Sequence, residues 1–178
     1  MALGATIYKT SFSIADMDHH FYSDFDFTIA QHPSESNLRM MVRLIAFALN
    51  ADEALGFTKG LSSDDEPELW KKSFGGDIEL WIDIGQPDEK RIRKACGRSD
   101  EVIIYTYNPK ASEAWWRQNE SKLRRFKNLS VVALSIEGDP ETLLKRSMQL
   151  QANIQDGELL LIHDEKSITE TRNILQQQ

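Results

Sequence analysis

Residues 66–97, EPELWKKSFGGDIELWIDIGQPDEKRIRKACG, indicate the fold more clearly than any other stretch of the chain. Two strand-like runs, each with a tryptophan, flank Gly75-Gly76, and a basic segment that opens with a proline follows them. Glycine at both central positions is typical of a two-residue type I′ hairpin turn, because that turn needs positive φ at both. The stretch therefore predicts a β-hairpin followed directly by a helix.

The register of this hairpin would bring two carboxylates together. With Gly75-Gly76 as the loop, the facing pairs are Trp70–Trp81, Lys72–Glu79 and Glu68–Asp83. Facing side chains lie about 5 Å apart at Cβ, and like charges placed in this way destabilise a sheet. We therefore expect something positive beside Glu68 and Asp83: a divalent metal, a neighbouring Lys or Arg, or a shared proton.

The composition is that of a globular protein with one core. The chain has 178 residues, of which 40% are hydrophobic, with four Trp and eight Phe,. The N-terminal segment turns polar within ten residues, and no window approaches the roughly 18 apolar residues of a membrane span. The lone Cys96 cannot form an internal disulfide and is more typical of a small buried side chain than of a nucleophile. We expect a single cytoplasmic domain, residues 1–178, without a membrane partner.

The formal charge of −7 argues against a surface coated uniformly for nucleic acid, but the charge is uneven,. Basic residues gather in two clusters, residues 90–98 and 117–127. Such clusters could frame a groove for nucleic-acid phosphates, or they could be the solvated outer faces of two helices. The sequence leaves both interpretations open, and it does not indicate the oligomeric state.

Periodicity along the rest of the chain predicts an α/β fold with a mixed sheet and flanking helices. The strands 101–107 and 129–137 are apolar, and the helix between them implies a parallel crossover. The other predicted elements are a hairpin 5–30, a helix 34–55 capped by Ser34, a helix from Pro87 to Gly97, a helix 110–127, a short helix at Pro140, a hairpin turning at Asp156-Gly157, and a helix near 167–175,.

Asp83 is the sharpest candidate for a functional carboxylate. Along a strand, Glu79, Trp81, Asp83 and Gly85 would share one face. Glu79 lies four residues, about 13 Å, from Asp83 and cannot share an ion with it. A buried carboxylate without a partner costs several kcal/mol, so Asp83 should meet either a metal ion or a cation of the following helix, Arg91 or Lys94.

Four stretches carry a resemblance to a known family: HPSES (32–36), DDEPELW (64–70), ELWIDIGQPDEKRIRKAC (79–96) and TYN (106–108). Through them the chain resembles the YaeQ family, bacterial proteins of uncharacterised function, nearly from end to end. That family's fold is similar to the PD-(D/E)XK nuclease core. The resemblance implies a restriction-endonuclease-like core at about 34–137, with extra β-hairpins: an N-terminal hairpin at 5–30, and a hairpin and helix at about 138–178.

The resemblance also implies a metal site. The nuclease superfamily places one acidic residue after a proline and a second on the next strand, and these match Pro67-Glu68 and Asp83. Glu68, Asp83 and the carbonyl oxygen of Ile84 would hold one Mg²⁺ or Mn²⁺, which would activate a water for attack on a phosphodiester.

The remaining positions of the superfamily's site are matched less well. Glu35 is a weak counterpart of the acidic residue that the preceding helix often adds, and Gln86 could position the water or the substrate. Gly85 stands where a lysine is expected. Without that cation the departing oxyanion loses an electrostatic partner worth orders of magnitude in rate, unless Lys90 or Lys94 of the next helix replaces it.

Two functions follow from this pattern. The first is a Mg²⁺- or Mn²⁺-dependent nuclease whose lysine has moved. The second is a catalytically inactive, nuclease-derived scaffold that binds nucleic acid or a protein partner. Gly85 favours the scaffold, whereas the opposed carboxylates Glu68 and Asp83 favour the nuclease.

Overall fold

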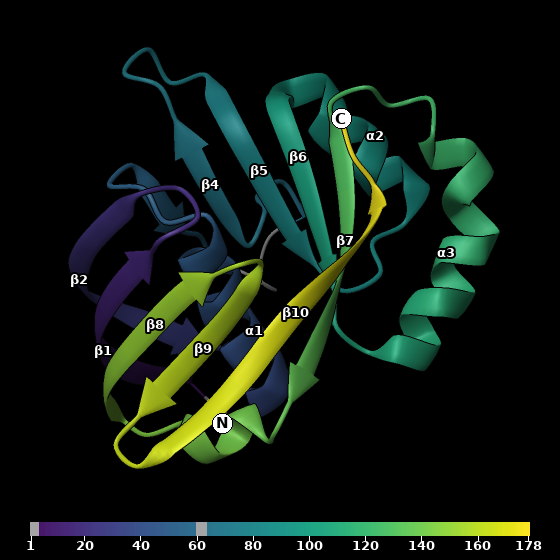
Figure 1. The fold of residues 1–178 in the computed structure, drawn as a ribbon. Helices are drawn as coiled ribbons and strands as arrows, with labels where there is room; N and C mark the ends of the chain where they lie inside the picture. The colour runs from purple at the N-terminus through teal and green to yellow at the C-terminus, as the bar shows by residue number, and fades with distance from the viewer. Residues whose placement is uncertain (1–3, 60–63) are drawn as a thin grey trace. The chain divides into compact units, whose positions relative to one another are not determined.

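The computed structural model describes residues 4–59 and 64–178 (Figure 1). The chain forms two compact units: unit 1 comprises Met1–Ala51 and Ile136–Thr171, and unit 2 comprises Asp52–Ser135 and Arg172–Gln178. Each unit combines helices with parallel and antiparallel strands, so the predicted α/β class with a mixed sheet is confirmed. Within the described residues, no helix is both long and apolar enough to cross a membrane.

Unit 1 has the strand order β2-β1-β8-β9-β10. Its elements are β1 (Thr6–Asp16), β2 (Phe21–Gln31), α1 (Asn37–Leu49), the 3₁₀ helix η2 (Pro140–Leu143), β8 (Ser147–Gln155), β9 (Glu158–His163) and the first part of β10 (Lys166–Gln176). The predicted N-terminal hairpin is confirmed, because β1 and β2 pair antiparallel. Phe12, Phe25 and Phe27 from these strands contact Phe47 of α1, so one face of the hairpin packs against the helix.

Unit 2 has the strand order β7-β6-β5-β4-β3. Its elements are β3 (Leu55–Phe57), β4 (Leu69–Lys72), β5 (Ile78–Ile84), α2 (Glu89–Arg98), β6 (Ser99–Thr106), α3 (Pro109–Leu123) and most of β7 (Leu129–Glu137). The predicted parallel crossover is confirmed, since β6 pairs parallel with β7. The strand β6 also pairs parallel with β5. The helices α2 and α3 bury their apolar sides against these strands, in a core formed by Ile78, Trp81, Ile92, Ala95, Val102, Ile104, Trp115, Leu123, Leu129 and Val131.

The predicted register of the β4–β5 hairpin is confirmed over most of β4. The observed pairs are Leu69–Ile82, Trp70–Trp81 and Lys71–Leu80. An irregularity between Lys71 and Lys72 then places Lys72 opposite Ile78, so the predicted Lys72–Glu79 pair is wrong. The Glu79 carboxylate lies 3.7 Å from the Nζ of Lys71 instead.

The predicted two-residue turn at Gly75-Gly76 is also wrong. Only Gly76 has a positive φ, 93°, and the loop runs from Ser73 to Asp77. The Ser73 N–H donates to the Asp77 carbonyl at 2.9 Å, and the Gly76 N–H donates to the Ser73 carbonyl at 3.0 Å. By contrast, both residues of Asp156-Gly157 have positive φ between β8 and β9, as predicted for a type I′ turn,.

Helix α1 is shorter than predicted at both ends. Its N-cap is Ser36, whose hydroxyl accepts a hydrogen bond from the Arg39 N–H at 3.1 Å,. The predicted cap, Ser34, lies outside the helix and bonds to the ring of His32. At the other end the helix closes at Asn50, and the chain enters the short strand β3, which the sequence did not predict.

The predicted helix near 167–175 is wrong, because these residues belong to the strand β10. Asp164-Glu165 turns the chain directly from β9 into β10, and the two strands pair antiparallel, with Ile168 opposite Leu161. The strand is rich in Thr and Ile, residues whose branched side chains fit a pleated surface. The pairing partner therefore decides the conformation of this segment.

Candidate functional site

Asp83 lies near the end of β5 with its carboxylate buried. Both of its oxygens accept hydrogen bonds from Arg91: Nε donates to Oδ2 at 2.8 Å, and Nη2 donates to Oδ1 at 2.9 Å. This is the bidentate arrangement in which guanidinium and carboxylate match best. Of the two cations that the sequence left open as partners of Asp83, Arg91 is the one observed, and Lys94 pairs with Asp65 instead.

The charge of Glu68 also influences the guanidinium of Arg91. Glu68 immediately precedes β4 and is buried, and its N–H donates to the Ile82 carbonyl at 2.9 Å. The hydrogen bond to Asp83 is the main cause of the raised pKa of Arg91, and the charge of Glu68 raises that pKa further. A cation beside the two carboxylates is thus supplied by the chain itself.

Arg91 also joins α2 to the residues before β4. Its Nη2 donates to the Glu66 carbonyl at 2.8 Å, and its Nη1 donates to the Asp64 carbonyl at 3.2 Å. The side chain is nevertheless 24% exposed. Arg91 therefore joins the buried Asp83 to the solvent-exposed side of α2.

The end of β5 differs from the predicted strand. The strand ends at Ile84, and Gly85 has φ 97°, a conformation that side-chain-bearing residues rarely adopt,. The Gly85 N–H donates to the Tyr105 carbonyl at 2.8 Å. The prediction that Gly85 continues the face of Asp83 is therefore wrong, and the exposed Gln86 follows this bend. A lysine at position 85 would stand on strained backbone.

The residues around Asp83 do not fit Mg²⁺ or Mn²⁺ as they are arranged. Both oxygens of Asp83 are engaged by Arg91, and the fixed positive charge of that guanidinium opposes a second cation,. Mg²⁺ requires near-octahedral oxygen coordination. Throughout residues 4–59 and 64–178, no three or more His, Cys, Asp or Glu side chains are grouped so that they could hold a metal.

Four basic residues line one side of α2, and we call them the α2 row: Lys90, Arg91, Lys94 and Arg98. Lys90, Lys94 and Arg98 are spaced four residues apart, and Arg91 lies three residues before Lys94, so all four share one side of the helix, and the row is about 12 Å long,. The guanidinium carbons of Arg91 and Arg98 lie 5.9 and 5.4 Å from the ring centroid of Trp81. Lys90, Lys94 and Arg98 are exposed, so the row presents cations to solvent.

The second basic cluster, residues 117–127, is more evenly balanced. Its arginines form the exposed ion pairs Arg117–Glu113 and Arg124–Glu120, and Arg125 pairs with the partly buried Glu89. Trp115 points into the core, and its Nε1 donates to the Pro87 carbonyl at 2.9 Å. Exposed pairs of this kind are typical of a solvated helix face.

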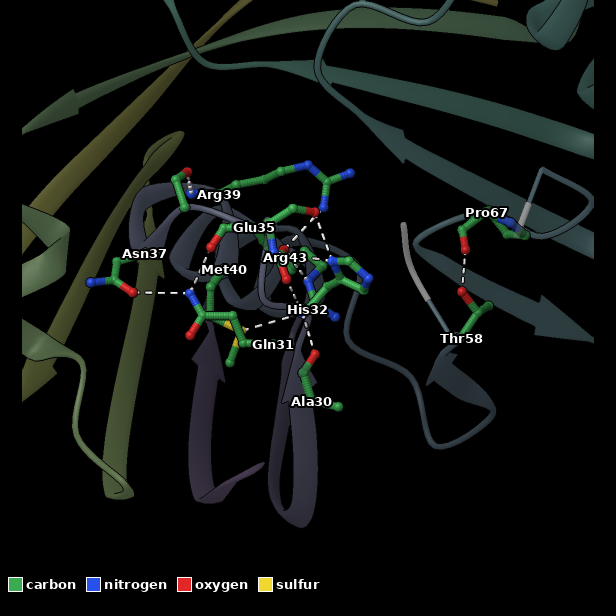
Figure 2. A network of polar contacts seen from close by, with 12 residues as sticks. Ala30, Gln31, His32, Glu35, Asn37, Arg39, Met40, Arg43, Thr58 and Pro67 are labelled. Carbon is green, nitrogen blue, oxygen red and sulfur yellow. Dashed lines mark hydrogen bonds and ion pairs between the residues drawn. The ribbon is translucent and has the colours of Figure 1, made fainter. Parts of the chain in front are cut away.

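In unit 1, Glu35 is part of a sealed network (Figure 2). Its Oε1 accepts from Arg43 Nε at 2.8 Å and from Arg39 Nη1 at 3.0 Å, and its Oε2 accepts from Arg43 Nη2 at 2.8 Å. Arg43 also donates to the Ala30 carbonyl at 2.6 Å. Glu35 lies just before α1 and not on it, and it belongs to unit 1, whereas Glu68 and Asp83 belong to unit 2.

Gln31 completes this network from the end of β2. Its Nε2 donates to the Glu35 carbonyl at 3.0 Å and to Asn37 Oδ1 at 2.9 Å (Figure 2). Its Oε1 accepts from the Tyr8 hydroxyl at 3.0 Å. Glu35, Arg39 and Arg43 lie four residues apart, so their sequence spacing places them along one stripe, but their burial was not predicted,. The signal for it is an arginine within the apolar run MMVRLIAF, which indicates a buried acidic partner,.

Cys96 lies on the inner side of α2. Its side chain is half-buried against the core of unit 2, and burial raises the pKa of the thiol to about 11. The thiol is therefore neutral at physiological pH. This agrees with the interpretation of Cys96 as a packing residue and not a nucleophile.

The chain is similar over nearly its whole length to curated bacterial proteins. The family model described as "YaeQ protein" matches residues 1–172. The chain is 48% identical over 174 residues to "Uncharacterized protein YaeQ" of Escherichia coli (strain K12), covering 94% of each chain. It is 48% identical over 164 residues to the protein of the same name from Salmonella typhi, covering 90% of each.

Two crystal structures have a closely similar fold. The YaeQ protein from Xanthomonas axonopodis pv. citri matches with a TM-score of 0.92 and 44% identity, over 98% of this chain and 99% of that one. The YaeQ protein from Pseudomonas syringae matches with a TM-score of 0.91 and 30% identity, over 98% and 97% of the respective chains.

Proposed function

The chain belongs to the YaeQ family, and from this premise we propose that unit 2 is a cytoplasmic nucleic-acid-binding module that does not cleave its ligand. The α2 row contacts the phosphates, and the restriction-endonuclease-like core implied by the family resemblance serves as the scaffold.

The observation that carries the proposal is the bidentate Asp83–Arg91 pair. A nuclease carboxylate has to offer its oxygens to a metal ion. Freeing Asp83 would break two charge-assisted hydrogen bonds, each worth about 1.5–3 kcal/mol,. The left-handed backbone at Gly85 supports the same conclusion, because it disfavours a lysine where the nuclease superfamily has one.

The distribution of charge between the units is compatible with nucleic-acid binding by unit 2. Unit 1 holds 6 Lys and Arg against 13 Asp and Glu, whereas unit 2 holds 15 against 15. The whole formal charge of −7 therefore belongs to unit 1. The overall charge does not argue against a phosphate-binding face on unit 2.

The α2 row fits a sequence-independent mode of binding. Its length of about 12 Å spans several phosphates of one strand, which repeat about every 3.4 Å along a duplex. Contacts from Lys and Arg to phosphates position a protein on nucleic acid without reading bases. Binding should therefore weaken steeply with salt.

Fluorescence anisotropy with labelled single-stranded DNA, duplex DNA and single-stranded RNA at low salt, with EDTA present, tests this function. The double variant Lys90→Glu, Lys94→Glu should weaken binding at least about tenfold, because it reverses half of the row. The matched control is Lys9→Glu, Lys166→Glu, which makes the same charge change at exposed positions of unit 1. Equal loss in both double variants, or no binding by the wild type, would contradict the proposal.

Metal-dependent cleavage is the alternative that the experiment has to exclude: Glu68 and Asp83 are both buried carboxylates, but Asp83 would have to exchange Arg91 for a metal ion. In that case the wild type should bind Mn²⁺ in calorimetry and cleave a labelled strand, and Asp83→Asn should lose both. No heat of binding and no cleavage with Mn²⁺ would leave the binding module as the function.

A further inference from the structure

An acidic stretch of the same chain already lies on the α2 row. We call Asp64–Glu66 the acidic segment. The Asp65 carboxylate forms an ion pair with Lys94, and the Asp65 carbonyl accepts from Arg98 Nη1 at 2.9 Å. Arg98 and Lys94 are thus both engaged by a single acidic residue.

Arg91, a third member of the α2 row, also binds the acidic segment. Its guanidinium donates to the carbonyls of Glu66, at 2.8 Å, and Asp64, at 3.2 Å. Three of the four members of the α2 row therefore bind oxygen atoms of the acidic segment. These carboxylate and carbonyl oxygens accept hydrogen bonds from Lys and Arg, as the oxygens of a phosphate group would.

The acidic segment is held in position from its C-terminal side. The Pro67 carbonyl accepts from the Thr58 hydroxyl, and the Glu68 N–H donates to the Ile82 carbonyl at 2.9 Å. The hydrogen bond from Lys94, reinforced by the charges of Lys94 and Arg98, lowers the pKa of Asp65. Asp65 is therefore ionised at neutral pH and competes as an anion.

We propose that the acidic segment occupies the phosphate positions of the α2 row and acts as a built-in competitor for nucleic acid. This inference rests on the proposed function and specifies how the same site is regulated. A phosphate strand that binds the row takes the place of Asp65 at Lys94 and Arg98. Only molecules whose α2 row is not covered by the acidic segment bind nucleic acid. The apparent affinity of the wild type is therefore the intrinsic affinity of the row multiplied by the uncovered fraction.

The expected effect is moderate. The Asp65 and Lys94 side chains are 76% and 45% exposed, and exposed ion pairs are weak,. A phosphate strand can therefore displace the segment. Removing the competing charge should tighten binding by about three- to tenfold at low salt, an effect that salt diminishes.

The test uses a fluorescein-labelled single-stranded oligothymidylate, low salt and EDTA. Asp65→Asn should bind about three to ten times more tightly than the wild type, whereas Asp77→Asn should stay within about twofold. Asp77 is the matched control, because it is an exposed aspartate of unit 2 in the β4–β5 loop. Circular dichroism checks that each variant is folded.

A double-variant cycle separates competition at the row from a general effect of charge. In a Lys94→Gln background Asp65→Asn should give a much smaller gain, because the side-chain partner of Asp65 is already absent. Equal gains from Asp65→Asn and Asp77→Asn, or no gain from Asp65→Asn in a wild type that does bind, would overturn the competitor while the proposed function stands. Absence of binding in every variant would overturn both.

Discussion

Each unit contains a buried carboxylate bound bidentately by an arginine eight residues later: Glu35 by Arg43 in unit 1, and Asp83 by Arg91 in unit 2. The surroundings differ. The Arg43 side chain is 3% exposed and sealed by protein acceptors, whereas the Arg91 side chain is 24% exposed and leads onto the α2 row. The same pair of groups thus stabilises a core in one unit and forms the base of a charged surface in the other.

The largest expected effect is at the sealed pair. Glu35→Gln should lower the free energy of unfolding by about 3–5 kcal/mol, because it leaves the buried charge of Arg43 without its counter-ion,. Urea denaturation measures this loss. The control Glu158→Gln removes an exposed carboxylate of unit 1 and should stay within about 0.5 kcal/mol,. A loss below about 1 kcal/mol at Glu35 would show that the network does not hold unit 1 together.

Substitution in the partly exposed Asp83–Arg91 pair should lower the free energy of unfolding less. Asp83→Asn should cost about 1–3 kcal/mol in the same assay, because Arg91 keeps its bonds to the Glu66 and Asp64 carbonyls and can turn toward solvent,. If Asp83→Asn destabilises the protein more than Glu35→Gln does, the distinction between a sealed and an open pair is wrong.

The backbone conformation at Gly85, two residues after Asp83, can be tested in the same assay. Gly85→Ala should destabilise by about 1 kcal/mol, because alanine disfavours φ 97°,. Gly97→Ala is the control with the opposite sign: it lies in α2 with open space around it, and it should stabilise by about 0.5–1 kcal/mol,. A neutral or stabilising Gly85→Ala would show that the strand can accept a side chain there.

The smallest effect concerns Cys96, which is half-buried on the inner side of α2. Because burial raises the pKa of Cys96 to about 11, its thiolate fraction at pH 8 should be about 100-fold below that of an unfolded chain,. The protonated thiol is favoured in the folded state, so its contribution to stability is present below the unfolded pKa of about 9 and is lost as pH rises through 11,. Iodoacetamide labelling should be slow at pH 8 and accelerate toward pH 11. Equally fast labelling of native and urea-unfolded protein would contradict this.

The sequence predicted those features that local pattern determines. The register of β4 and β5 followed from two strand-like runs around a glycine pair, and Trp70 does face Trp81. The turn itself was wrong, because a glycine pair does not reveal where positive φ falls once an irregularity shifts the register at Lys72. The strand β10 was read as a helix, because its partner β9 and not its own periodicity sets its conformation.

The candidate site was predicted only in part, for a similar reason. A buried Asp83 required a positive partner, and Arg91 was among the partners considered. The contacts of Asp64 and Asp65 with α2 are set by the path of the chain before β4, which no local pattern encodes. Glu35 directly precedes the N-cap of α1 and Arg43 lies about two turns into that helix, so their spacing allows a contact, but their burial beside the Ala30 carbonyl depends on three-dimensional packing.

Metal-independent phosphate binding by the α2 row is tested most directly by a salt titration of oligonucleotide binding by anisotropy, performed in parallel with Mn²⁺ and with EDTA. We expect equal affinity under both conditions, an intact oligonucleotide, and a slope of log affinity against log salt of about −2 to −3, as for three or four phosphate contacts on a single strand. That slope should become shallower in the Lys90→Glu, Lys94→Glu variant. Binding that requires Mn²⁺ and disappears in Asp83→Asn would show that unit 2 holds a metal-dependent site and not a metal-independent phosphate-binding row.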